Sequence, residues 1–448
     1  MTLAEHEDLL KSASHVQEGS ESEVSGAPPP ALLPQPTTSQ ERVAALDVLR
    51  GFAILGILLV NMAVFNSPLF YFLADIQLWP GTLDSAVRLF IRFFAESKFY
   101  SMFSFLFGLG FCIQMERARE RGGRFGGVYV RRLVVLLLLG QAHAHLIWNG
   151  DILTFYAVLG FVLFLFRNRS PKTLLIWAVV FLLLPLLFNT VLTVLVELGR
   201  TVPEVRSEID AQFAQVMVEF KERGDEALEV YTSGSFLEIM RLRRAELFSF
   251  YGFLLFILVP NVLAMFLIGM YVGRRSIHRD ITGHLPLIKK VAAWGLVWGV
   301  LGNATYTFAM TKAQPALPSF MSLLAAGGIM VGAPAMCLAY VCGLTLLVQI
   351  ASWRRRLAPI AAVGRMALTN YLLQSVICTA IFYSYGLGLY GRCSSVYGLL
   401  LTLTIYGLQI PFSVWWLRRY RFGPLEWVWR SLTYAQRQPM RRPQPPAV

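Results

Sequence analysis

The side chains best suited to proton transfer lie in a short segment between two apolar runs. His143 ends the first run and Asp151 opens the second. A histidine that a carboxylate orients can act as a general base, so the pair predicts acid–base chemistry at this turn. His143 and His145 cannot both face one cavity, because residues two apart on a helix point about 200° apart, and the spacing does not say which of them does. The spacing leaves an alternative open, in which Asp151 only caps the helix that begins after Asn149 and Gly150.

Further polar residues belong with that turn. Glu96 and Lys98 enter another apolar run from the same side, where Lys98 could stabilise an oxyanion; an interfacial ion pair between the two is the alternative. Asn61 lies at the same end of an earlier run and could serve the same purpose. The predicted catalytic residues are therefore His143, Asp151 and Lys98. The predicted substrate-binding residues are Asn61, Glu96, Trp148 and Gln374.

Arginines at the opposite ends of the apolar runs could bind an anion. In the segment LDVLRG, Asp47 and Arg50 are spaced i, i+3 and can pair on one helix face. Arg50 could also hold a phosphate through charge-assisted hydrogen bonds, which makes both residues candidates for cofactor binding. The alternative is a local salt bridge whose arginine reaches the membrane surface. Asn61 returns to nearly the same face as Arg50, so a polar stripe could run along this helix.

The segment GRMALTNYLLQS, residues 364–375, holds the third polar group. Asn370 and Gln374 are spaced i, i+4 and share one helix face, with Arg365 near the same end as Arg50. Arg365 and Asn370 are therefore predicted to bind an anionic cofactor. Paired amides in an apolar helix more often hydrogen-bond a neighbouring helix, and this alternative stays open.

The elements that must position these residues are membrane-spanning helices. Of the 448 residues, 56% are hydrophobic and 15% are charged, and the mean hydropathy is +0.54. A spanning helix needs roughly 20 apolar residues, and runs of that kind recur along the chain. This composition excludes a soluble α/β enzyme and predicts an all-α bundle of about ten spans. The predicted spans are 46–66, 99–115, 131–148, 151–167, 173–198, 247–273, 287–310, 325–350, 361–388 and 396–417.

The basic residues predict the orientation of the bundle. Six arginines lie between residues 117 and 132, and this densest cluster should face the cytosol. Counting spans from there puts every later basic cluster on the same side, which supports an even number of spans with both termini inside. The net charge of +13 thus follows from membrane topology and does not indicate a nucleic acid partner. The later clusters are 167–172, 274–290, 354–356 and 418–421.

The remaining segments are polar. Residues 201–246 carry ten acidic and six basic residues, with apolar residues at helical spacing. This pattern predicts an amphipathic helix or helix pair on the outer face that begins near Pro203, whereas a solvated helix that only covers lipid-facing edges is the alternative. Residues 1–40 read as a disordered cytosolic tail without a cleavable signal. The other predicted units are two membrane bundles, 41–200 and 247–435, and a basic, proline-rich cytosolic tail, 436–448.

The five cysteines are scattered, mostly through apolar runs. Their spacing matches neither a CxxC pair nor a zinc site with neighbouring histidines. We therefore expect free, buried thiols and no metal. The cysteines are Cys112, Cys337, Cys342, Cys378 and Cys393.

Four segments, in this order, resemble the YeiB family of bacterial membrane proteins, which has a C-terminal domain of unknown function. The resemblance covers nearly all of residues 42–435, and the order of the segments makes it specific. The segments are LDVLRGFAILGILLVN (46–61), ESKFYSMFSFLFGLGF (96–111), HAHLIWNGDILTFYAVLG (143–160) and GRMALTNYLLQS (364–375).

This family is similar to transmembrane acyltransferases such as the lysosomal heparan-glucosaminide acetyltransferase. Those relatives move an acyl group from cytosolic acyl-CoA to an acceptor across the membrane and use an essential histidine on the far side. His143 matches the histidine of the family's H…W-x-G-D-I-L pattern, whereas His145 stands where an apolar residue is expected. The heparan enzyme's histidine lies elsewhere in its sequence, so its role does not transfer residue by residue.

The resemblance favours an acyl-CoA-dependent acyltransferase of the bacterial cytoplasmic membrane, with acetyl-CoA as a candidate donor and an extracytoplasmic hydroxyl or amine as acceptor. Arg50 and Arg365 would hold CoA phosphates, and His143 would take the acceptor's proton. The expected partners are the lipid bilayer, the donor and the acceptor, and a homodimer is compatible with the sequence.

Two rival hypotheses stay open. A transporter or export protein for a small solute or lipid would use Asp47, Arg50, Glu96 and Asp151 as gating or proton-coupling groups. The sequence has no clear inverted repeat and no matching pair of broken spans, which weakens this hypothesis. A scaffold without catalysis is the third alternative.

Overall fold

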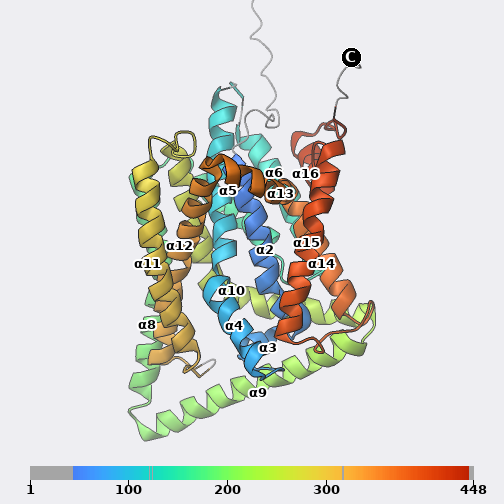
Figure 1. Ribbon diagram of the computed structural model, residues 1–448. Coiled ribbons are helices and arrows are strands. Elements are labelled where there is room, and N and C mark those ends of the chain that lie inside the picture. The colour runs from blue at the N-terminus through green and yellow to red at the C-terminus, as the bar shows by residue number, and fades with distance from the viewer. Residues whose placement is uncertain (1–43, 121, 124, 315–316, 443–448) are drawn as a thin grey trace, which may run out of the picture.

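The computed structural model describes residues 44–442 except 121, 124, 315 and 316, and leaves out the side chains of 250–257. Within this part of the chain the regular structure consists of helices packed into one upright bundle (Figure 1). The predicted all-α fold is confirmed. The tail predicted for residues 1–40 and the last six residues of the predicted C-terminal tail lie outside the described residues.

Ten helices form the apolar bundle, at the places of the ten predicted spans. Seven segments of the described chain are long and apolar enough to cross a membrane, and Leu153–Leu165, Leu258–Arg274 and Ala367–Phe382 are shorter apolar segments. The orientation with both termini inside stays a prediction. The ten helices are α2 (Ala44–Asn66), α5 (Lys98–Glu120), α6 (Phe125–Leu146), α7 (Leu153–Leu165), α8 (Pro171–Gly199), α10 (Phe236–Arg274), α11 (Leu285–Met310), α12 (Phe320–Gln349), α14 (Ala367–Phe382) and α15 (Ser395–Arg419).

Five other helices complete the described fold. They are α3 (Leu69–Leu73), α4 (Thr82–Phe94), α9 (Pro203–Ser233), α13 (Ala351–Arg365) and α16 (Pro424–Tyr434). The sequence analysis missed α4 because Asp84, Arg88 and Arg92 interrupt its apolar residues. An amphipathic helix of this kind gives a weak signal in a search for continuous apolar runs.

Helix α8 shows why the bundle belongs in lipid. Only 11% of its most apolar window is buried inside the protein. Leu183, Leu187 and Leu195 are among its exposed side chains. An apolar surface of this size on a soluble protein would drive aggregation, whereas in hydrocarbon it costs nothing to expose.

The polar segment 201–246 is helical, as its spacing predicts, but it is not a separate unit, because residues 236–246 form the first turns of α10. Pro203 opens α9 as predicted, and Gly234 follows its last turn. Ser235 then caps α10, because its hydroxyl accepts a hydrogen bond from the Glu238 amide while the Glu238 side chain accepts one from the Ser235 amide. Helix α9 crosses one whole end of the bundle (Figure 1).

The ninth predicted span is not one continuous helix. It breaks at Met366, where α13 ends and α14 begins. Helix α13 packs across the start of α2, and a Cβ atom at Gly364 would collide with the carbonyl of Asp47. The start of α14 at this break is stabilised by Glu426 of α16, whose carboxylate accepts hydrogen bonds from the free amides of Leu368 and Thr369. Periodicity along one segment cannot reveal a cap supplied from a distant helix.

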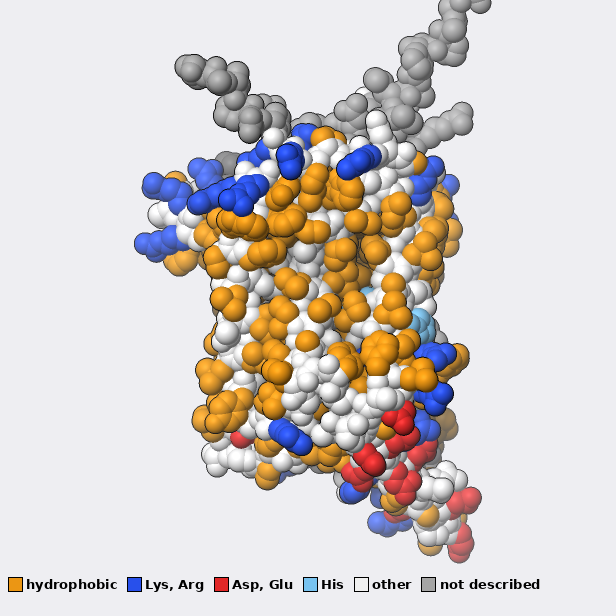
Figure 2. All heavy atoms as spheres, turned by 90° about the vertical axis from the view of Figure 1, so that its right-hand side faces the viewer, with side chains coloured by type: hydrophobic (Ala, Val, Ile, Leu, Met, Phe, Trp, Pro, Cys, Tyr) orange, Lys and Arg blue, Asp and Glu red, His pale blue; other side chains and the backbone are white. Residues whose placement is uncertain are grey.

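Charge divides between the two ends of the bundle. Lysine and arginine gather mainly at the end where the C-terminus lies, and many acidic residues gather toward the opposite end (Figure 2). Contacts confirm that three of the basic clusters, 117–132, 167–172 and 274–290, share one end: Arg279 pairs with Glu120 at 3.1 Å, and Arg274 donates to the Arg167 carbonyl. We call these the basic end and the acidic end. The positive-inside rule predicts that the basic end is cytosolic.

The five cysteines are free, as predicted. Cys112, Cys337 and Cys378 are buried, but Cys342 and Cys393 are only half-buried, which corrects the expectation that all five are buried.

Candidate active site

A buried polar pair joins α6 to the start of α7. The Nδ1 atom of His143 lies 2.8 Å from Oδ1 of Asp151, and their side chains are 1% and 0% exposed. The other carboxylate oxygen of Asp151 accepts the Thr154 amide at 2.7 Å. Asp151 therefore makes both contacts that the sequence left open, since one oxygen caps the helix and the other contacts the histidine. The role of the histidine as a base stays a prediction.

This contact sets the chemistry of the histidine ring. An ionised carboxylate can only accept a hydrogen bond, so Nδ1 of a neutral His143 carries the proton and Nε2 holds a lone pair. Nε2 is buried and has no hydrogen-bond partner among the described residues. The rings of Trp148 and Tyr371 stand beside the imidazole, with centroids 6.3 and 5.3 Å away. This arrangement would suit a shielded, oriented general base.

Gly140 explains how the two helices come close enough to make this contact. A Cβ atom at this position would lie 2.6 Å from the Thr154 nitrogen and 3.0 Å from Asp151 Oδ2. These separations are too short for nonbonded heavy atoms, so only glycine lets the start of α7 rest against α6. The His143–Asp151 pair thus depends on a residue one turn earlier in α6.

A small cavity of about 240 Å³ opens beside the pair, on the side of the acidic end. We call it the outer cavity. Asp151 lines it together with Asn61, Glu96 and Trp148, which confirms that these predicted residues share one place. Glu96 is held there by a 2.6 Å hydrogen bond from the Tyr306 hydroxyl. The described lining includes two carboxylates and two amides but no lysine or arginine, so it suits a neutral or cationic polar group.

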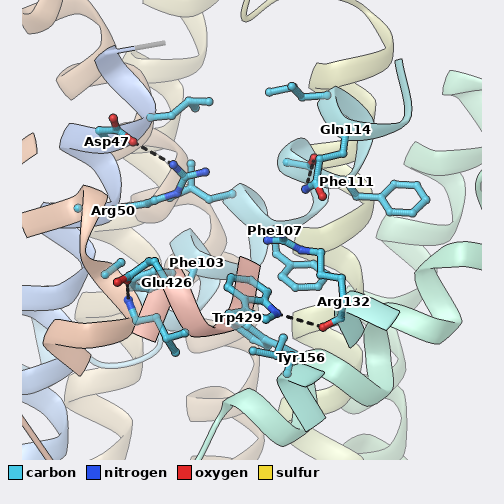
Figure 3. A pocket seen from close by; sticks show the side chains of 18 of the residues that line it. Asp47, Arg50, Phe103, Phe107, Phe111, Gln114, Arg132, Tyr156, Glu426 and Trp429 are labelled. Carbon is cyan, nitrogen blue, oxygen red and sulfur yellow. Dashed lines mark hydrogen bonds and ion pairs between the residues drawn. The ribbon is translucent and has the colours of Figure 1, made fainter. Parts of the chain in front are cut away.

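A larger cavity of about 700 Å³ opens toward the basic end. We call it the basic cavity. Figure 3 shows Asp47 and Arg50 on one wall and Arg132 with Trp429 on another, with the rings of Phe103, Phe107 and Tyr156 between them. Its described lining includes six arginines and three carboxylates, so its field favours an anion. The arginines are Arg50, Arg117, Arg132, Arg279, Arg365 and Arg430.

Local contacts hold the charged walls of this cavity. Arg50 pairs with Asp47 at 3.0 Å, as predicted from their spacing. The Arg132 guanidinium lies 3.9 Å from the ring centroid of Trp429, whose indole nitrogen donates to the Arg132 carbonyl. Burial raises the pKa of Glu426 even though hydrogen bonds from α14 oppose that shift. Burial, with Arg279 and Arg117 nearby, lowers the pKa of His278 to about 4, so His278 adds no charge at neutral pH.

The two cavities meet at a thin wall. Ile57, Ile152 and Tyr371 line both of them. The Tyr371 hydroxyl donates to the Gly150 carbonyl at 3.3 Å, and its ring packs beside His143. A side chain of Tyr371 thus separates a basic compartment from an outer compartment directly next to the candidate base.

Four predicted site residues lie outside the described linings of both cavities. His143 is one of them, although its partner Asp151 lines the outer cavity; the other three are Lys98, Asn370 and Gln374. Lys98 is fully buried, and its ammonium donates to the Arg92 carbonyl at 2.9 Å. Asn370 donates to Ser413 at 3.0 Å, and Gln374 donates to Gln409 at 2.8 Å. The two amides therefore join α14 to α15, which is the interhelical alternative left open by the sequence. His145 is half-buried and lines neither cavity.

Sequence reasoning missed several residues of the basic cavity. Arg117 and Arg132 were noticed only as topology signals, although their density was the available clue. Arg279, Glu426, Trp429 and Arg430 come from segments far along the chain, and no local spacing connects them to Arg50.

Comparison with known proteins places the whole chain in one family. Residues 272–436 match the family described as "Protein of unknown function (DUF418)". The chain is 40% identical over 425 residues to "Uncharacterized protein YxaH" of Bacillus subtilis (strain 168), covering 91% of this chain and 98% of that protein. It is 30% identical over 418 residues to "Uncharacterized protein YeiB" of Escherichia coli (strain K12), covering 88% and 96%.

No solved structure matches the chain. The resemblance to the YeiB family is confirmed, whereas the similarity to transmembrane acyltransferases stays a prediction, because these relatives' names carry no activity. The chain belongs to the YeiB family of helical membrane proteins and carries its DUF418 region at residues 272–436.

Proposed function

We propose that the protein is a transmembrane acyltransferase that moves an acyl group from cytosolic acyl-CoA to a hydroxyl or amine on the other side of the bacterial cytoplasmic membrane. The observation that carries this proposal is the shared wall of Ile57, Ile152 and Tyr371 between a basic and an outer cavity, with the His143–Asp151 pair beside it. Donor and acceptor could then meet without either one crossing the bilayer.

The basic cavity has the two properties that an acyl-CoA site needs. Its arginines, Arg50 and Arg365 among them, could bind phosphate oxygens through charge-assisted hydrogen bonds. Its remaining walls are aliphatic and aromatic, with Ile54, Phe103 and Leu106 as examples, and would accommodate the less polar arm and the acyl group. A nucleotide without an acyl arm would fit the site less well, because it would leave the apolar walls without a contact.

The transfer step follows from the state of His143. The acceptor's oxygen or nitrogen attacks the thioester carbonyl, and His143 Nε2 takes the proton that the acceptor loses. As the new C–O or C–N bond forms, the C–S bond breaks, and the proton passes from His143 to the CoA thiolate. Asp151 keeps the ring in the reactive tautomer and stabilises its charged form.

The outer cavity would hold the acceptor. Asn61 is in its lining and can donate a hydrogen bond to the oxyanion, a role for which the orientation of Lys98 toward the Arg92 carbonyl offers no support. Glu96 and Trp148 would contact the acceptor itself. Asp47 would act indirectly by orienting Arg50.

Calorimetry on the purified full chain tests the donor site. We expect acetyl-CoA to bind, and Arg50→Ala and Arg365→Ala each to weaken binding about 10-fold or more, because each removes a charge-assisted contact. Arg119→Ala is the matched control, since Arg119 is exposed on α5 and outside the cavity lining. Absence of acetyl-CoA binding by the wild-type protein, or equal loss in all three variants, would remove the proposal.

One observation favours the rival function of transport. Two cavities that open toward opposite ends, separated by one wall and next to the helix break at Met366, also describe an occluded path for a solute. Solute flux into proteoliposomes without any acyl-CoA would favour transport. In that case the Tyr371→Ala variant of the protein should let solute pass faster, because the wall between the cavities is reduced. Acyl transfer without flux would favour the enzyme.

A further inference from the structure

A second buried polar cluster lies between the start of α10 and the turn that follows α6. Arg243 and Glu246 are 0% and 2% exposed and sit one helical turn apart in α10. Oε2 of Glu246 accepts hydrogen bonds from the Asn149 amide and from the Tyr231 hydroxyl, both at 2.6 Å. The proposed reaction uses neither charged residue. Arg243 and Glu246 lie outside the described lining of both cavities, whereas their partner Asn149 lines the outer cavity.

Arg243 and Glu246 hydrogen-bond to the two ends of the turn from His145 to Asn149. Arg243 donates to the His145 carbonyl at 3.3 Å, and Glu246 holds Asn149. Between these points Trp148 stacks on Phe65, with ring centroids 4.0 Å apart. This turn lies between His143 and Asp151, so its geometry sets the distance between the members of the candidate catalytic pair.

We propose that Arg243 and Glu246 are positioning residues that clamp the His143–Asp151 turn, and that ionisation of Glu246 loosens this clamp. The clamp would make the site responsive to the pH of the compartment at the acidic end. This inference rests on the proposed function only where it names acyl transfer as the regulated reaction. The clamp itself is argued from hydrogen bonds and does not depend on that reaction.

The geometry accounts for the direction of the switch. One oxygen of Glu246 accepts two hydrogen bonds and the other, Oε1, has no partner among the described residues. Either protonation state leaves Oε1 without a partner, but an ionised carboxylate also leaves charge on this buried oxygen, so ionisation costs more here than the neutral form. Burial raises the pKa of Glu246 to about 7, so the group changes charge in the neutral range. Opening the turn to water relieves the buried charge and is therefore favoured at higher pH.

Other titratable groups face the same cluster and must be separated from Glu246. His143 and His145 lie at the end of α6, where the contacted turn begins, and Arg243 lies one helical turn before Glu246 in α10. Those from the other packed elements are Glu226 and Tyr231 of α9, and Tyr383 and Tyr390 after α14. A Glu246→Gln substitution removes only the Glu246 titration and keeps an oxygen that can accept from Asn149 and Tyr231.

Hydrogen–deuterium exchange of the full chain in detergent micelles tests the clamp without any substrate. The amides of Ile147, Trp148 and Thr154 report on it, because each donates a hydrogen bond within the turn. After correction for intrinsic exchange rates, we expect wild-type protection to fall about 10-fold between pH 5 and pH 8. Glu246→Gln should stay protected throughout, and Glu246→Ala should be unprotected throughout.

Glu229→Gln is the matched control, since Glu229 is exposed on α9, and it should behave as wild type. Equal pH dependence in wild type and Glu246→Gln, or full protection in Glu246→Ala, would overturn the proposal. The activity arm is separate: transfer should decline above pH 7 in the wild type and not in Glu246→Gln, with the KM for acyl-CoA unchanged. If no variant transfers an acyl group while the exchange results hold, the clamp stands and the proposed function fails.

Discussion

The basic cavity and the outer cavity of the same bundle differ in the charge of their linings: arginines outnumber carboxylates in the first, and the second has carboxylates but no described lysine or arginine. The basic cavity is large and gathers arginines from α2, α5, α6, α13 and α16, with further basic residues from the loop after α10. The outer cavity is small, has no described cation in its lining and depends on one turn that other residues hold in place. The difference teaches that anion binding and proton transfer, if the proposed function holds, would use separate regions, so substitutions should affect one without the other.

Removal of the base should have the largest effect. His143→Ala is expected to lower acyl transfer about 10²- to 10⁴-fold, the usual contribution of a positioned general base. Asp151→Asn should approach the same loss, because it favours the wrong tautomer of the ring and keeps the helix cap. Acetyl-CoA binding by calorimetry should be unchanged in both variants. Weaker donor binding in His143→Ala would show that the two cavities are not separable.

The stability of the acidic end should depend on pH through Glu246. Its folded pKa of about 7 lies above the ordinary value of 4.5, so ionisation destabilises the fold as pH rises between these values. The cost is absent below about pH 4.5 and complete above about pH 7, where it reaches about 3 kcal/mol if unfolding relieves the whole shift. The apparent melting midpoint of Glu246→Gln relative to wild type should therefore rise with pH. A constant difference would argue against a raised pKa.

A larger residue at the contact between α6 and α7 should lower acyl transfer but not acetyl-CoA binding. Gly140→Ala introduces a Cβ atom 2.6 Å from the Thr154 nitrogen, and such overpacking costs about 1–3 kcal/mol. Acyl transfer should fall together with stability, while acetyl-CoA binding persists in the folded fraction. Gly127→Ala on the same helix is the control, because no atom lies within 4 Å of its added Cβ.

A smaller effect is expected in the basic cavity when Trp429 is replaced. Trp429→Leu removes the ring that lies 3.9 Å from the Arg132 guanidinium, a contact worth about 0.5–2 kcal/mol. Acetyl-CoA binding should weaken 2- to 30-fold while the pH profile of transfer keeps its shape. Trp427→Leu is the control on the same helix, since Trp427 contacts Gln438 and lies outside the lining. A changed pH profile would link the two regions.

The comparison also separates what the sequence could predict from what it could not. Contacts within one helix or across one turn were predictable, as the Asp47–Arg50 pair and the His143–Asp151 pair demonstrate. Hydrophobic length located the spans because hydrocarbon penalises polar backbone and charge.

Contacts between distant helices were not predictable from spacing. Helical periodicity defines the faces of one helix but does not say which faces meet, so the approach of Trp429 to Arg132 had no local signal. Lys98 was assigned to the outer site from its position along the chain, yet its buried ammonium donates to the Arg92 carbonyl. The clamp by Glu246 was hidden for the same reason, because Asn149 is almost a hundred residues away.

The central claim is that one reaction uses both cavities across the wall of Ile57, Ile152 and Tyr371. Membrane vesicles of defined orientation, loaded with a mixture of candidate acceptors, test it directly when [acetyl-¹⁴C]acetyl-CoA is supplied on one side only. We predict that label appears on acceptors at the acidic end only when acetyl-CoA contacts the basic end. His143→Ala should reduce this labelling 10²-fold or more, and Arg365→Ala should require about 10-fold more acetyl-CoA for the same labelling. Label transferred from acetyl-CoA at the acidic end, or transfer that persists undiminished in His143→Ala, would contradict the account.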